Sequence, residues 1–135
     1  MTCLARFGSP AILALLAACG GGKDGGPPPS QAGDLIVSYF QGGPAAGAML
    51  FTITGGTVQG VTARSGQQLQ VSFASPVAGT TRVIVTGPLS TGDIVTVRVP
   101  DVGLSTSYSA RVEQVADNVT FSLIDPALHT LTIHR

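Results

Sequence analysis

The sequence predicts an all-β fold, a single antiparallel β-sandwich over residues 34–135. Short runs rich in Val, Ile, Thr and aromatic residues alternate apolar with polar side chains, and Gly, Pro, Asn and Asp interrupt them at short intervals. No window in this part of the chain has the apolar spacing of an amphipathic helix. The 18 glycines and nine prolines also disfavour helices. A small closed barrel is the alternative arrangement of the same strands.

The expected strands follow one another from residue 35 to residue 134. They span residues 35–40, 48–54, 58–63, 68–73, 81–86, 94–99, 108–115, 119–124 and 129–134. Residues 68–73 alternate most regularly between apolar and polar side chains. Pro100 ends the expected strand 94–99, because proline cannot donate to a sheet ladder. Apolar-in, polar-out alternation of this kind fits two sheets that close over one core.

The alternation also predicts which side chains form the core. We expect these side chains to be mostly buried: Phe51, Val71, Phe73, Val85, Val97, Val112, Phe121 and Ile133. We expect a second set to be mostly exposed: Arg82, Thr96, Arg98, Arg111 and Thr132. Tyr39 and Phe40 are adjacent, so one of the two rings must point outward.

The N-terminus carries a different signal, Leu16-Ala17-Ala18-Cys19, at the end of an apolar run over residues 10–18. Arg6 precedes the run, which is shorter than the roughly 20 residues that a membrane-spanning helix needs. This stretch resembles the lipobox of bacterial lipoproteins. The resemblance implies that residues 1–18 are a signal peptide and that Cys19 becomes the lipidated N-terminus.

Such a protein is held in the cell envelope by membrane lipid through its acylated Cys19, and two or more acyl chains give stable attachment. Gly20, in place of Asp, follows the Cys, which favours the outer membrane if the host is Gram-negative. Residues 19–33 are rich in Gly and Pro and have no apolar pattern, so they predict a flexible linker between the anchor and the domain.

Three segments of the domain share a pattern with a known family. They read AMLFTI at residues 48–53, RVIV at 82–85 and GDIVTVRV at 92–99. This order resembles cohesin-type β-sandwich domains, which are immunoglobulin-like in architecture. The resemblance implies the fold and carries over no binding residues. The whole layout also resembles small bacterial lipoproteins, and that likeness implies no activity.

Composition excludes several classes of function. Charged residues make up 10% of the chain and the formal net charge is +0, so no electrostatic footprint for nucleic acid is present. The two cysteines are Cys3, inside the expected signal peptide, and Cys19. The mature domain is therefore expected to have no disulfide and no thiol chemistry.

The sequence marks no catalytic residue, cofactor site or metal site. His129 and His134 are the only histidines, and we expect both to be exposed strand residues on opposite sides. A metal pair would need a third ligand. Asp117, Asn118 and Asp125 bracket an expected strand, and their spacing favours turns, with a calcium site as the alternative.

These observations predict a protein that is not an enzyme. We expect a membrane-anchored, non-catalytic protein-interaction or structural module of the cell envelope. The alternative is a carbohydrate-binding module at the cell surface, with a polysaccharide in place of a protein partner. Sugar sites stack aromatic rings on pyranose rings, and this chain has no Trp. The outward ring of the Tyr39–Phe40 pair is the one platform that the sequence offers.

Overall fold

The computed structural model describes residues 25–135, and these residues confirm the all-β prediction. Within them, nine strands and two short 3-10 helices follow one another. The strands are β1 (Gly33–Gln41), β2 (Ala46–Thr54), β3 (Gly60–Ala63), β4 (Gln70–Val77), β5 (Thr80–Thr86), β6 (Gly92–Val99), β7 (Ser109–Asp117), β8 (Leu123–Ile124) and β9 (His129–His134). The helices are η1 (Val102–Ser107) and η2 (Pro126–Leu128).

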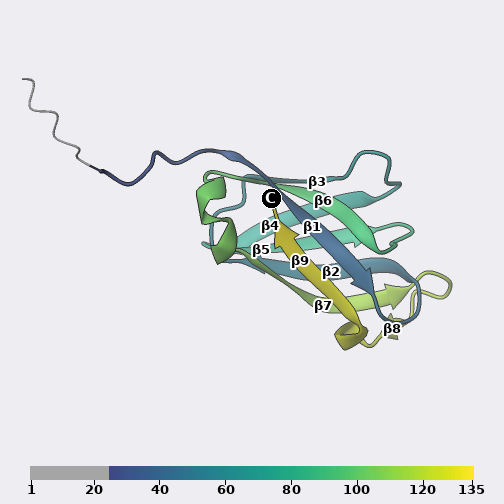
Figure 1. Cartoon of the computed structure of the whole chain (residues 1–135). Coiled ribbons are helices and arrows are strands. Elements are labelled where there is room, and N and C mark those ends of the chain that lie inside the picture. The colour runs from purple at the N-terminus through teal and green to yellow at the C-terminus, as the bar shows by residue number, and fades with distance from the viewer. Residues whose placement is uncertain (1–24) are drawn as a thin grey trace, which may run out of the picture.

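The strands form two antiparallel sheets, and this arrangement is the predicted sandwich. The four-stranded sheet has the order β3-β6-β1-β9, and the five-stranded sheet has the order β4-β5-β2-β7-β8. Figure 1 shows the two layers, with residues 25–32 entering beside η1 and with β8 and η2 at the opposite end. The two ends of the sandwich therefore differ in their distance from the N-terminal segment.

The inner faces of both sheets supply one continuous core. Its largest fully buried side chains come from β1, β2, β5 and β6: Tyr39, Phe51, Leu35, Met49, Ile53, Ile94 and the six valines Val37, Val83, Val85, Val95, Val97 and Val99. Burying a side chain of this size contributes roughly 1.5–3 kcal/mol. With no cysteine in the described residues, this apolar contact holds the two sheets together.

Most of the predicted core is confirmed. Phe51, Val85 and Val97 are fully buried. Three more residues are partly buried and pack against the core: Val71, Val112 and Ile133. Of the residues expected outside, four are exposed (Arg82, Arg98, Arg111 and Thr132), and Thr96 is half-buried.

The prediction for Phe73 is wrong, because its side chain is 42% exposed. Phe73 lies opposite the fully buried Val83, so it is on the inner face as expected. However, β4 is an edge strand of eight residues, and the neighbouring edge of the other sheet, β3, has only four. Alternation predicted the face of this residue but not how far the opposing sheet extends.

The prediction for Phe121 is also wrong, since its ring is 63% exposed. The expected strand over 119–124 shrinks to β8, and Phe121 has a φ of 55° in the turn before it. Its ring packs over Gly47, where an added Cβ would lie 3.1 Å from the ring and 2.7 Å from the Cα of Asn118. Turn hydrogen bonds to Asp117 take precedence over strand formation here.

The last residues of the linker dock onto the sandwich. The Val102 amide donates to the carbonyl of Gln31 at 2.8 Å, and the Arg135 guanidinium donates to the carbonyl of Val102. Asp101 caps η1 by accepting from the Gly103 amide. The N-terminal segment and the residue at position 135 thus meet at one helix. Within residues 25–135, no helix has the length and apolar character to cross a membrane.

Candidate functional site

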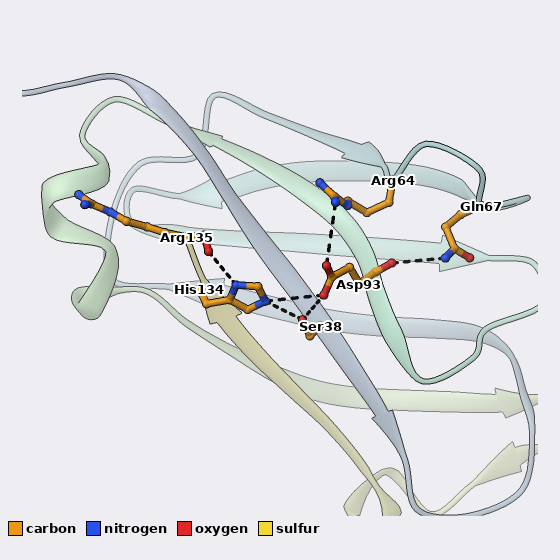
Figure 2. Close-up of polar contacts among 6 residues, drawn as sticks. All are labelled: Ser38, Arg64, Gln67, Asp93, His134 and Arg135. Atoms are coloured by element: carbon orange, nitrogen blue, oxygen red, sulfur yellow. Dashed lines mark hydrogen bonds and ion pairs between the residues drawn. The ribbon is translucent and has the colours of Figure 1, made fainter.

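The outward side chains of the four-stranded sheet gather Ser38, Asp93 and His134 (Figure 2). Ser38 is on β1, in the middle of the sheet, and lies opposite Asp93 of β6. His134 is on β9, where it lies opposite Ile36, two residues before Ser38. Antiparallel pairing of three strands therefore brings together residues that are up to 96 positions apart.

Side-chain hydrogen bonds connect Ser38, Asp93 and His134. Ser38 Oγ is 2.5 Å from Asp93 Oδ1 and 2.8 Å from His134 Nε2. His134 Nδ1 faces the carbonyl of Arg135 at 2.9 Å, and a carbonyl only accepts. Ser38 has one hydroxyl proton, and when it donates this proton to Asp93 the histidine must donate to Ser38.

Two further residues surround the Asp93 side chain and backbone. Arg64 lies 4.0 Å from Asp93 Oδ2, and Gln67 Nε2 donates to the Asp93 carbonyl at 3.5 Å. The Ser38 hydrogen bond holds the pKa of Asp93 below its usual value, and the charges of His134 and Arg64 act in the same direction against partial desolvation. We call Ser38, Arg64, Asp93 and His134 the Ser38 cluster.

The Ser38 cluster contains the residue types of a nucleophilic triad but in another order. A serine nucleophile gives its proton to a histidine base, which a carboxylate orients from the other side. Here the serine lies between the carboxylate and the ring, and its proton goes to Asp93, a weak base. The cluster connects β6, β1 and β9 through side-chain contacts on the outer face of the sheet. The sequence analysis did not predict this cluster. Its residues occupy outward positions on separate strands, and the sequence does not show that these strands pair with one another.

His129 contradicts the expectation of an exposed strand residue, since it is only 4% exposed. Its ring stacks on Tyr39 with centroids 5.9 Å apart, and its Nδ1 is 2.7 Å from the Tyr39 hydroxyl. The Nε2 atom is buried without a hydrogen-bond partner. Burial lowers the pKa of His129, which favours the neutral ring. His134 does face outward, so the two histidines are on opposite sides of β9 as predicted.

Asp117, Asn118 and Asp125 serve turns in this structure. The Asp117 carboxylate accepts from the amides of Val119, Thr120 and Ser122, and from the Thr120 hydroxyl. These bonds lower the pKa of Asp117 to about 2. Asp125 accepts from the Ala127 amide at the start of η2, and Asn118 is exposed. In residues 25–135 no three acidic, His or Cys side chains are grouped as metal ligands would be.

The outer face of the five-stranded sheet has a different character. Five of its outward side chains are apolar and lie next to one another across β8, β7, β2 and β5: Leu123, Ala116, Ala48, Leu50 and Ile84. Leu123 is 71% exposed and Ile84 is 50% exposed. We call these five residues the apolar outer face. Outward strand positions are usually polar, so a group of apolar side chains at such positions is typical of an interaction surface.

Two hollows shape the apolar outer face, and both are lined by Leu50 and Ile84. One, of about 220 Å³, extends towards Ala116 and Leu123. The other, of about 340 Å³, extends towards β4 and Arg82. Leu50 and Ile84 thus form a ridge between two depressions, each large enough to take side chains of another molecule.

The next row of the same sheet is cationic. Thr52 lies opposite Arg111 on one side and Arg82 on the other, and both arginines are exposed. Neither forms an ion pair with a residue in the described part of the chain. The acid beside them, Glu113, accepts a 2.5 Å hydrogen bond from the Thr52 hydroxyl. The apolar outer face is therefore bordered by two arginines whose guanidinium groups have no ion-pair partner among residues 25–135.

Of the adjacent rings considered as a sugar platform, Phe40 is the outward one. It is 60% exposed, whereas Tyr39 is 1% exposed. Phe40 lies opposite Thr130 on the four-stranded sheet. The sequence prediction that one ring must point outward is confirmed, and the ring is Phe40.

Comparison with protein-family models, curated proteins and solved structures finds no match to this chain. The likeness to cohesin-type domains stays a prediction from the sequence pattern. The expected signal peptide and the expected lipid-attachment residue, Cys19, lie outside the described residues, so the anchor also stays a prediction.

Proposed function

We propose that this chain is a non-catalytic lipoprotein of the cell envelope whose β-sandwich binds a partner protein. The apolar outer face carries this proposal. Its five apolar side chains and two hollows lie on a sheet surface that the sandwich itself leaves uncovered. Burial of exposed apolar area is the main driving force in most protein association.

Two other observations support a role in binding. The lipobox ending at Cys19 and the linker that follows would hold the domain near other envelope components and raise their effective concentration. The Ser38 cluster satisfies its own polar groups and directs the serine proton to Asp93, an arrangement that does not activate a nucleophile. A binding module held at the membrane accounts for the anchor and for the absence of an activated serine in the Ser38 cluster.

Site-specific photo-cross-linking tests the proposal in the cells that make the protein. A photoreactive residue at position 84 of the full-length chain should yield a discrete cross-linked protein. The matched control is the same residue at position 62, which lies on an exposed part of β3 in the other sheet. If position 84 gives no more product than position 62, the apolar outer face does not bind a protein and the proposal fails.

The anchor is tested separately by Cys19→Ala. This substitution removes the thiol that receives the lipid, so the chain should stay unprocessed or be released from the membrane fraction. Detergent phase partitioning of the wild-type and substituted chains measures the effect. Equal partitioning of the two, with processing at the same place, would show that the lipobox interpretation is wrong.

A carbohydrate-binding module is the second candidate, and the exposed Phe40 ring favours it. Stacking on a sugar needs an accessible aromatic face, and Phe40 offers one on the four-stranded sheet. Affinity electrophoresis against envelope polysaccharides should then show retardation that Phe40→Ala removes. The matched control is Leu104→Ala, which removes a similarly exposed apolar side chain at η1.

A further inference from the structure

We infer that the partner segment recognised by the apolar outer face is acidic and amphipathic, with carboxylates that meet Arg82 and Arg111. This inference rests on the proposed function, because it names the chemistry of the partner at the same surface. An exposed apolar sheet face is buried when an element packs one apolar side against it. An amphipathic segment provides such a side.

The positions of the charges determine the sign of the partner. Arg82 and Arg111 flank Thr52 on neighbouring strands, so both guanidinium groups border the apolar residues along one line. Each group presents a planar fork of donors that matches a carboxylate. Glu113 is engaged by Thr52, so its carboxylate is held by a hydroxyl on the central strand. A cationic partner would meet two arginines that form no ion pair among residues 25–135, and only the one carboxylate of Glu113 lies beside them.

The other sheet provides a contrast that supports this assignment. Arg98 on its outer face is 3.2 Å from Asp34, and Arg64 lies beside Asp93. Those two arginines already have carboxylate partners within the domain. Arg82 and Arg111 differ in having none among residues 25–135. They are therefore the cations whose carboxylates would come from another molecule.

The shape of the surface favours a protein segment over a membrane. Leu50 and Ala48 are half-buried, and hollows of about 220 and 340 Å³ flank the ridge that Leu50 forms with Ile84. Discrete depressions accept individual side chains, whereas insertion into a bilayer needs apolar groups that protrude together. Binding to lipid is accordingly treated as an outcome that would contradict the inference.

A set of three synthetic peptides tests the inference on the full-length chain in detergent. All three have Leu at helical i, i+3 and i+4 positions, and the remaining positions carry Glu, Lys or Gln. Two exposed ion pairs predict that the Glu peptide binds about tenfold more tightly than the Lys peptide at low salt, with the Gln peptide between them. Raising the salt concentration should narrow this difference.

Charge-reversal variants test whether Arg82 and Arg111 cause the preference for the Glu peptide. Arg82→Glu combined with Arg111→Glu should abolish or reverse the preference for the Glu peptide. Arg98→Glu, which changes an exposed arginine on the other sheet, should leave it intact. Vesicles of anionic phospholipid serve as the lipid probe. A photoreactive residue at position 84 should form no cross-link to the lipid of these vesicles.

Four results would overturn the inference: no binding of the Glu peptide, equal binding of all three peptides, tighter binding of the Lys peptide, or charge-dependent binding to the vesicles alone. Each of them leaves the proposed function to be decided by the cross-link at position 84. A cross-link there together with equal peptide affinities would retain a protein partner and reject its acidic character. Loss of the cross-link would reject both.

Discussion

The outer faces of the two sheets differ in how their side chains are satisfied. On the four-stranded sheet, Ser38, Asp93 and His134 bond to one another, and Arg98 pairs with Asp34. On the five-stranded sheet, apolar residues are exposed and two arginines have no internal partner among the described residues. A surface whose polar groups are mutually bonded gains little from another molecule. A surface with exposed apolar area and free donors gains from being covered.

The largest expected effect is on the core that both faces share. Phe51 is fully buried, so Phe51→Ala should cost about 3–5 kcal/mol of unfolding free energy and weaken both sheets together. Phe73→Ala is the control, because its ring is 42% exposed and should cost clearly less. The urea midpoints of the two variants measure the difference. Equal losses would mean that the edge strand β4 is packed against something in solution.

The next effect is a pH dependence from the neutral, buried ring that lies beneath the four-stranded sheet. Burial lowers the pKa of His129 from the usual 6.5, so the unfolded chain takes up a proton that the folded chain does not. Stability should therefore fall as the pH drops below about 6.5. His129→Phe keeps the stacked ring and removes this titration.

Urea midpoints at pH 7.5 and pH 5.5 test this effect. The difference between the two midpoints should shrink in His129→Phe and persist in His134→Gln, which changes the exposed histidine of the same strand. Persistence of the full difference in His129→Phe would assign it to another group.

A smaller effect concerns the edge of the apolar outer face. Asp117 holds the turn that places Leu123 beside Ala116, and its hydrogen bonds lower its pKa from 3.8 to about 2. Its stabilising contribution is complete above pH 3.8 and is lost as the pH falls towards 2. Asp117→Asn should raise hydrogen exchange in residues 118–124 at neutral pH and leave β1 and β9 unchanged. Slower exchange there would contradict this role of the carboxylate.

The smallest effect is expected in the Ser38 cluster. Its groups are partly exposed, and exposed ion pairs contribute little to stability. Ser38→Ala should shift the urea midpoint by no more than Arg98→Ala does, and it should leave the cross-link at position 84 unchanged. A loss of partner binding in Ser38→Ala would mean that the two faces are not independent.

The sequence predicted the sandwich and most of its core because alternation reports which side of a strand each residue faces. For Phe51, Val85 and Val97, alternation alone was enough to predict that the side chain is buried. Phe73 and Phe121 failed for different reasons, since the first depends on where the opposing sheet ends and the second on a turn that Asp117 organises. The alternation of apolar and polar residues reports neither the extent of the opposing sheet nor the presence of this turn.

The surface features were less accessible to sequence reasoning. Ser38 and His134 meet only because β9 pairs with β1, and a one-residue change of register would separate them. In β7 the register shifts between Gln114 and Val112, so both Val112 and Val115 face the core despite their odd spacing. Neighbours across strands depend on pairing and bulges, which the run of residue types along one strand does not reveal.

The meeting of Gln31, Val102 and Arg135 at η1 has a practical consequence. A short peptide joining residue 135 to residue 31 would make the sandwich circular, and new termini could then be opened at the exposed turn near Gly66, away from the apolar outer face. In such a permuted chain the proposed anchor would be attached at the opposite end of the sandwich. Comparing its cross-links with those of the natural order would reveal whether the partner approaches from the membrane side or from the far side.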